Sequence, residues 1–279
     1  MKMKKMTLFA AILALVGCGS PNKSEADGDA KSKKCLVIYY SQTGVTQKVA
    51  QEIAKLLDAD IFRIEVEQPY SGTYEETIER SRKEMEEGLL PKLKEMKVDF
   101  TKYDVIFLGY PIWFGTYAMP IATLVDEVDF AGKKIVPFCT FGSGGLVSSM
   151  NNLKTALPEA EICRGYGVRT ARIDKAPVEV QRFLKEYGYL DGEVEKLPEY
   201  SPQQPVNQEE IEIFNAACSG YKYPLGTPVS VGKRTTPEGT DYRFTAKSKN
   251  SEGNDIEAVI FVTVGKEQGA VPEFTEVVR

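Results

Sequence analysis

Residues 35–46 read Cys-Leu-Val-Ile-Tyr-Tyr-Ser-Gln-Thr-Gly-Val-Thr, an apolar run that passes directly into a short polar loop. The run 35–40 has no polar alternation, which is typical of a parallel strand covered on both faces. An apolar stripe at helical spacing follows the loop, at Val45, Val49, Ile53 and Leu56. A buried strand that turns through Gly44 into a helix predicts a layered sheet with helices packed on it.

The same alternation of strand and helix continues to about residue 190. Further strands are expected at 61–66, 104–110, 134–140 and 162–168, and further helices at 75–93, 121–128, 146–156 and 178–187. Five strands alternating with five helices predict an α/β domain with a doubly wound, five-stranded parallel sheet, because right-handed crossovers leave few other topologies. Ligands of such sheets bind beyond the carboxyl ends of the strands, where the winding reverses. We therefore expect the site in the loops after the first, third and fourth strands.

The composition restricts the chemistry that the chain can perform. None of the 279 residues is histidine, which removes the commonest general base and the His-dependent nucleophiles of hydrolases. No pair among the five cysteines has the C-x-x-C spacing of a zinc or dithiol site, so no metal site is expected. The formal charge of -5 gives no electrostatic reason to expect nucleic acid as a partner.

The first of the three loops has the features of an anion site. It leaves a strand and enters a helix, so the free N–H groups of the helix start face the loop and favour a phosphate. Gly44 allows the tight turn, and the loop has no lysine, which excludes a Walker-type loop. The alternative interpretation is an ordinary helix cap made of Ser and Thr.

The other two loops suit a flat ligand. Residues 110–117 contain Trp113, the only tryptophan of the chain, in an aromatic run that would cover a heterocycle. The alternative for this run is aromatic capping of the core. In residues 140–145 the glycines allow the main chain to approach a ligand closely, and the alternative there is a flexible turn.

Taken in register, residues 39–46, 108–113 and 140–144 resemble the three FMN loops of flavodoxins, and the resemblance covers residues 35–190. It implies an FMN-binding domain in which the phosphate is held by Ser41, Gln42, Thr43, Gly44, Val45 and Thr46. One side of the isoalloxazine would be flanked by Pro111, Ile112, Trp113, Phe114 and Gly115. The other side would be flanked by Thr140, Phe141, Gly142, Ser143, Gly144 and Gly145.

The resemblance also has a departure. Related flavodoxin-like proteins often carry a polar residue or histidine where Phe141 stands, so we expect a donor to the flavin edge to be missing. No side chain of the three loops is an evident proton donor. We therefore name no catalytic residue and expect the flavin itself to supply the redox chemistry.

The N-terminus resembles a bacterial lipoprotein signal. Residues 1–5 are basic, 7–16 are apolar but too short to span a bilayer, and Leu15-Val16-Gly17-Cys18 resembles a lipobox. This resemblance predicts residues 1–18 as signal peptide and lipobox, with Cys18 lipidated, and an exported protein anchored in the bacterial cell envelope. Residues 19–34 would form a flexible tether. The alternative is a plain signal or anchor in which the cysteine is incidental.

Residues 191–205 have the composition of a linker, and residues 206–279 predict a second domain. Asn207 and Glu210 form a capping box, the helix ends at Gly220, and strand-like runs follow at 227–235, 242–248, 258–264 and 274–278. This small α+β domain, one helix on an antiparallel sheet, resembles cystatins. In the first hairpin, where cystatins insert an apolar wedge into proteases, this chain carries Glu238, so a structural or partner-binding role is expected rather than inhibition.

Two hypotheses about function follow. The first is an FMN-binding flavodoxin-like lipoprotein that transfers electrons with an unknown redox partner, or reduces a small acceptor such as a quinone as an FMN-dependent oxidoreductase. The second is an exported binding module whose flavodoxin scaffold has lost flavin and whose cystatin-like domain binds a protein partner. The reason for this second hypothesis is the expected exported location, where reduced nicotinamide is not readily available.

Overall fold

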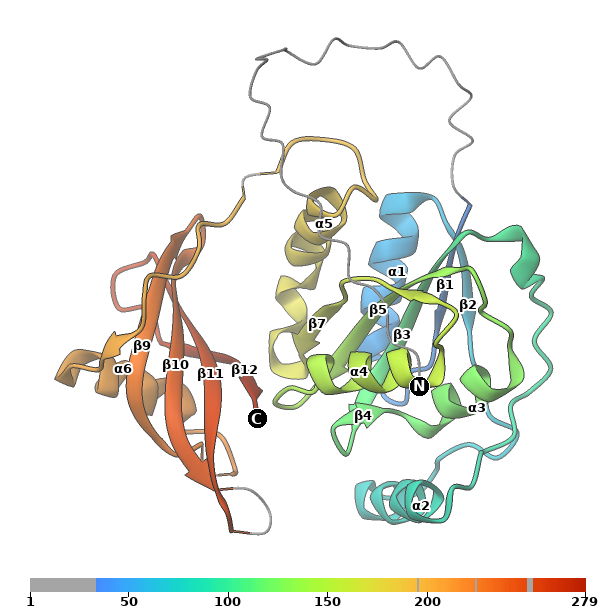
Figure 1. The fold of residues 1–279 in the computed structure, drawn as a ribbon, viewed down its shortest axis with the longest axis horizontal. Helices are drawn as coiled ribbons and strands as arrows, with labels where there is room; N and C mark the ends of the chain where they lie inside the picture. The colour runs from blue at the N-terminus through green and yellow to red at the C-terminus, as the bar shows by residue number, and fades with distance from the viewer. Residues whose placement is uncertain (1–33, 195, 224, 250–252) are drawn as a thin grey trace, which may run out of the picture. The chain divides into compact units, whose positions relative to one another are not determined.

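The computed structural model describes residues 34–194, 196–223, 225–249 and 253–279 (Figure 1). The predicted signal peptide, the lipobox with Cys18 and all of the predicted tether except Lys34 lie outside these residues. An α/β domain comes first and an antiparallel sheet with one helix follows, which confirms the predicted fold class. Within the described ranges, no helix has the length and apolar character that a membrane crossing needs.

The strands of the first domain form a parallel sheet in the order β2-β1-β3-β5, with β6 and β7 both paired to the outer edge of β5. Their bounds are Cys35–Tyr39 (β1), Asp60–Arg63 (β2), Val105–Trp113 (β3), Lys134–Phe141 (β5), Glu161–Ile162 (β6) and Tyr166–Arg169 (β7). The two-residue strand β4 (Thr116–Tyr117) is antiparallel to the end of β3. Strand order reverses direction between β1 and β3, as a doubly wound sheet requires.

One predicted strand, 162–168, is divided in the structure. Pairing with β5 stops after Ile162 and resumes at Tyr166, opposite Phe138. Pro137 lies at the break and has no N–H to donate to an edge strand. The edge of the sheet is therefore two short segments instead of one continuous strand.

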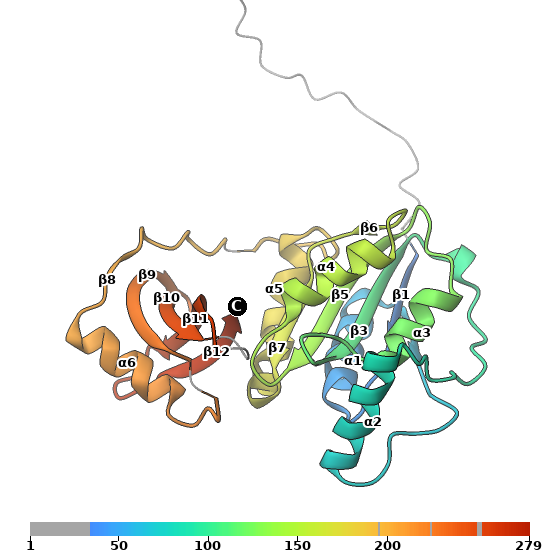
Figure 2. The ribbon, with the colours of Figure 1, turned by 60° about the horizontal axis from the view of Figure 1, so that its bottom comes forward.

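Helices cover both faces of this sheet (Figures 1 and 2). Helices α1 (Val45–Leu57) and α5 (Ala176–Glu186) pack on one face, and α3 (Met119–Glu127) and α4 (Leu146–Ala156) pack on the other. Neighbouring residues of β1 and β3 alternate between two buried clusters, such as Leu36 and Ile106 in one, Val37 and Phe107 in the other. Burial on both faces explains why these strands lack polar alternation.

Helix α2 (Tyr74–Glu87) lies beyond the sheet and ends earlier than predicted. The sequence predicted a helix to residue 93, but Gly88 takes a left-handed conformation at φ +65° and terminates it. Short 3-10 segments occur at Phe100–Lys102 and Thr170–Lys175.

The second domain places α6 (Gln208–Cys218) against a five-stranded sheet in the order β12-β11-β10-β9-β8. The strand bounds are Gln204–Pro205 (β8), Thr227–Thr236 (β9), Gly239–Lys249 (β10), Asp255–Gly265 (β11) and Glu273–Val278 (β12). The predicted capping box of Asn207 and Glu210 is confirmed. Phe214 of α6 packs edge-on against Phe244 of β10, with ring centroids 5.3 Å apart.

A substitution at Gly109 of β3 tests how tightly the parallel sheet is packed. It pairs with Tyr39 on one side and Phe138 on the other, and a Cβ atom here would overlap the buried Phe138 ring. We expect Gly109→Ala to lower the free energy of unfolding of the first domain by about 2 kcal/mol through overpacking. Thermal unfolding followed by the fluorescence of Trp113 measures this. The control is Gly220→Ala, which meets no atom within 4 Å; equal midpoints for the two variants would contradict the packing argument.

Candidate functional site

The three predicted loops meet at the carboxyl edge of the parallel sheet. The buried hydroxyls of Thr46 and Thr140 are hydrogen-bonded at 2.8 Å, which joins the first loop to the third. Ser148 in the first turn of α4 donates to the carbonyl of Gly115, which joins α4 to the second loop. The structure therefore brings together residues 33 and 94 positions apart in the chain.

The two helices that follow the first and third loops, α1 and α4, both begin at a glycine. The N-cap of α1 is Gly44 at φ +84°, the N-cap of α4 is Gly145 at φ +118°, and neither N-cap supplies a side-chain hydrogen bond. In contrast, α2 and α6 outside the site each carry a complete capping box. The first turns of α1 and α4 thus offer main-chain N–H groups to an anion, as a phosphate-bearing ligand requires.

Some polar side chains of the first loop are buried and hydrogen-bonded, and others are open to solvent. Ser41 and Thr46 are almost fully buried, and Ser41 Oγ accepts a 3.3 Å hydrogen bond from the N–H of Gln47. Thr43 is exposed, and Gly44 and Val45 are half-buried. The ordinary-cap alternative therefore applies to Ser41, whereas Thr43 to Val45 remain open to a ligand.

Arg63 is a site residue that the sequence analysis missed. It ends β2 beside Tyr39, and its guanidinium donates to the carbonyl of Ser41 at 3.1 Å and to Gln47 Oε1 at 3.4 Å. This places a positive charge against the first loop, where a phosphate would bind. The only sequence signal was an arginine at the end of the strand paired with the first.

The second loop is a β-hairpin. Strand β3 was predicted to end at Tyr110, but it continues through Pro111 and Ile112 to Trp113 and pairs with β4. Phe114 and Gly115 form the turn with φ of +50° and +80°, a combination that hairpin turns of type I′ require. Phe114 is 41% exposed, and the guanidinium of Arg82 lies 5.0 Å from its ring centroid.

Trp113 belongs to an aromatic cluster with Tyr40 and Tyr70. Its ring meets Tyr70 edge-on at 5.0 Å and Tyr40 at 5.9 Å between centroids. Gln42 joins the cluster by donating to the Tyr70 carbonyl at 2.7 Å. A cavity of about 250 Å³ lies beside it, between the first loop, Arg63 and Tyr70. The packing supports aromatic capping for Trp113 and leaves Phe114 as the exposed ring of the hairpin.

The third loop begins with two buried side chains, those of Thr140 and Phe141. Phe141 is the last residue of β5 and its ring lies in the core, so the structure does not turn that side chain toward a ligand. Ser143, Gly144 and Gly145 are half-buried, and a Cβ at Gly145 would crowd Ile112 of the hairpin. The second and third loops are therefore in direct contact, with little room for side chains between them.

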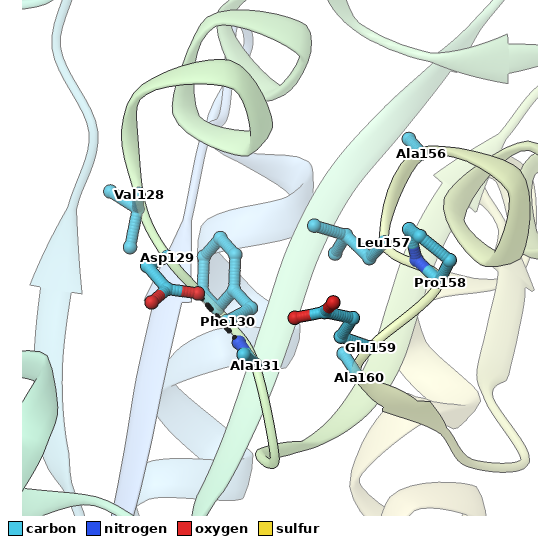
Figure 3. A pocket seen from close by; sticks show the side chains of 9 residues that line it. All are labelled: Val128, Asp129, Phe130, Ala131, Ala156, Leu157, Pro158, Glu159 and Ala160. Carbon is cyan, nitrogen blue, oxygen red and sulfur yellow. Dashed lines mark hydrogen bonds between the residues drawn. The ribbon is translucent and has the colours of Figure 1, made fainter.

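Another cavity, of about 180 Å³, lies at the opposite edge of the sheet, between the segments that lead into β5 and β6 (Figure 3). Its lining includes Phe130, Leu157 and Glu159, and it shares no residue with the three loops. It is separate from the predicted site.

Comparison with known families decides how this arrangement is classified. The family model described as flavodoxin matches residues 34–179, just over half of the chain. The chain belongs to the flavodoxin family. This confirms the flavodoxin-like assignment of the first domain and FMN as its cofactor, and the glycine-led helix starts fit the phosphate of that cofactor. A search of curated proteins gave no match.

Solved structures similar to the flavodoxin domain include three bacterial flavoproteins. A candidate flavoprotein of Bacteroides eggerthii is 30% identical, with 53% of this chain and 97% of that chain covered and a TM-score of 0.46. One from Bacteroides uniformis is 28% identical, with 53% and 98% covered and a TM-score of 0.49. A flavoprotein of Lactobacillus acidophilus solved with FMN is 23% identical, with 53% and 97% covered and a TM-score of 0.45.

Glu276 of β12 gives a pH-dependent prediction. Its Oε1 is buried without a hydrogen-bond partner among the described residues, and this burial raises the pKa of Glu276 to about 7. In the unfolded chain the Glu276 carboxyl ionises near pH 4.5. The free energy of unfolding therefore falls as pH rises from about 4.5 to 7, and the loss is constant above that range. Glu276→Gln should therefore be more stable than the parent chain at pH 8, by about 3 kcal/mol, but not at pH 4.5. Urea unfolding at both pH values measures this, and a pH-independent difference would contradict it.

Proposed function

We propose that this protein uses FMN, held by the three loops, to pass electrons to a redox partner or to a small acceptor such as a quinone. The observation that carries the proposal is the convergence of all three loops at two glycine-led helix starts. FMN supplies the electron and hydride chemistry when bound. The chain's own groups bind it, orient it and adjust its surroundings.

In this proposal Ser41 to Thr46 bind the phosphate with main-chain and hydroxyl donors, and Arg63 supplies a compensating charge. The hairpin of β3 and β4 and residues 140–145 flank the ring from two sides. Burial raises the pKa values of Tyr40 and Tyr110 above the usual value for tyrosine, so these phenols stay protonated at neutral pH. Tyr40 donates to Gln42 Oε1 and Tyr110 is hydrogen-bonded to Ser149 Oγ, so both phenols hold neighbouring segments in place. The chain has no histidine to exchange protons at neutral pH.

The exposed Phe114 supports a flat acceptor. Its ring lies at the tip of the hairpin beside Arg82, where an aromatic acceptor could stack on it. In an oxidoreductase of this kind, an added soluble quinone would be reduced and the reduced flavin would be oxidised. A pure electron carrier would react with a protein partner much faster than with the quinone.

The phosphate role of the first loop is tested by Gly44→Ala in the purified full-length chain. A Cβ here meets no atom within 4 Å but strains the backbone at φ +84°, so the helix start should shift and the Kd for FMN should rise about tenfold. Quenching of flavin fluorescence on binding measures the Kd.

Gly88→Ala is the matched control. It has the same left-handed backbone at φ +65°, nothing within 4 Å, and a place at the end of α2 outside the site. Equal Kd values for the two variants would show that the first loop does not hold the phosphate. A parent chain that binds no FMN at all, and carries none when taken from membranes, would favour the flavin-free binding module instead.

We extend the proposal to the cell envelope, where Cys18 would carry the lipid. Support comes from the lipobox-like sequence Leu15-Val16-Gly17-Cys18 after an apolar run. Cys18→Ser should move the protein from the membrane fraction to the soluble fraction of expressing bacteria, as measured by fractionation and immunoblot. Cys163→Ser, which leaves the lipobox unchanged, is the control, and membrane association of both variants would argue against lipidation at Cys18.

The second domain is proposed to be cystatin-like without protease inhibition. Its first hairpin ends in a tight turn, in which the Thr236 hydroxyl accepts hydrogen bonds from the N–H groups of Glu238 and Gly239. Glu238 forms an ion pair with Arg182 of α5. This hairpin is thus engaged within the chain, which supports an internal role over insertion into a protease cleft.

A further inference from the structure

The last strand of the chain binds the main chain of the third loop. The N–H of Val277 donates to the carbonyl of Ser143 at 2.7 Å. The carbonyl oxygen of Val277 lies so close to Gly144 that a Cβ at that position would overlap it. Strand β12 therefore contacts residues 143 and 144 with no side chain between the two backbones.

Arg169 ties the same two segments together. Its Nε donates to the carbonyl of Gly142 and its Nη1 donates to the carbonyl of Phe274, both at 2.8 Å. The guanidinium also lies 4.5 Å from the centroid of the Phe274 ring. Arginine is suited to this role because its planar fork holds two acceptors in a fixed geometry.

Two arginines of the first domain, Arg172 and Arg182, each form an ion pair with the second domain. Arg172 binds Glu273, the first residue of β12, at 3.0 Å and also binds Glu179 of α5 at 3.0 Å. Arg182 binds Glu238 at the tip of the β9–β10 hairpin. Arg172 thus secures the start of β12, whereas Arg182 secures a part of the second domain that does not touch the third loop.

We propose that the second domain is a built-in clamp on the FMN site, in which β12 and Arg169 fix the third loop in its ligand-binding conformation. The inference rests on the proposed function, because the third loop matters only if it borders FMN. Residues 142–145 contain three glycines and would lose much conformational freedom on binding a ligand. A loop fixed in advance by β12 avoids that loss, so FMN binds more tightly. Arg169 is accordingly a positioning residue, without contact to the cofactor.

Gly144→Ala tests the clamp from the loop side. Gly144 has no left-handed backbone, so alanine adds only a Cβ that displaces Val277. We expect faster hydrogen–deuterium exchange of the amides of residues 273–278 in the FMN-free full-length chain. Gly142→Ala is the matched control for exchange, because it lies in the same loop and meets no atom within 4 Å.

Arg169→Gln tests the clamp without altering the loop sequence. It should speed up exchange of residues 142–146 in the FMN-free chain and raise the Kd for FMN about tenfold. Arg182→Gln is the control: it also breaks a bond to the second domain but should leave both quantities within about twofold of the parent chain. Circular dichroism of each variant verifies that both domains remain folded.

The outcomes separate this inference from the proposed function. Faster loop exchange in Arg169→Gln with an unchanged Kd overturns the clamp while FMN binding stands. Unchanged exchange of residues 273–278 in Gly144→Ala, together with unchanged exchange of residues 142–146 in Arg169→Gln, also overturns it, because β12 would then not restrain the loop. If the parent chain binds no FMN, the proposed function fails, and the clamp as a device for FMN binding fails with it even where the exchange results hold.

Discussion

Both faces of β1, β3 and β5 are buried, and the rest of the flavodoxin domain depends on this constraint. A sheet covered on both sides can expose functional groups only at its edges or strand ends. The parallel direction puts three strand ends at one edge, so the first, second and third loops must meet there. The hydrogen bond between Thr46 and Thr140 is a direct result: Thr46 lies in the first turn of α1, after the end of β1, and Thr140 lies at the end of β5.

The site consists mainly of backbone. Gly44 and Gly145 open the starts of α1 and α4, and no N-cap side chain closes either start, while α2 and α6 are capped by their own residues. A helix that leaves its first turn free loses the stabilisation of about 1 kcal/mol that a good cap provides. At α1 and α4 a phosphate-bearing ligand would take the place of the cap. Helices α3 and α5 also have no side-chain cap, so α1 and α4 are distinguished by their glycine N-caps at the three loops and not by the missing cap alone.

The fold could be predicted from local patterns, because buried strands, helical stripes and capping residues are all visible in short stretches. The helix at 146–156 and the capping box at Asn207 have the predicted positions. The divided edge strand was missed because its cause, Pro137, lies in the neighbouring strand. The hairpin at Phe114 was missed because a non-glycine residue with positive φ gives no sequence signal. Arg63 contacts the first loop and β12 contacts the third, each from a segment distant in the sequence. A single sequence does not reveal such contacts.

The use of main-chain donors at Gly44 and Gly145 also has an evolutionary consequence. Every amino acid except proline presents the same N–H group, so residues next to these glycines can be exchanged over time without removing the donors. Insertions and deletions are different, since one added residue in either loop would rotate the whole first turn of the helix. Related chains could therefore differ widely in side chains around the site and still need loops of the same length.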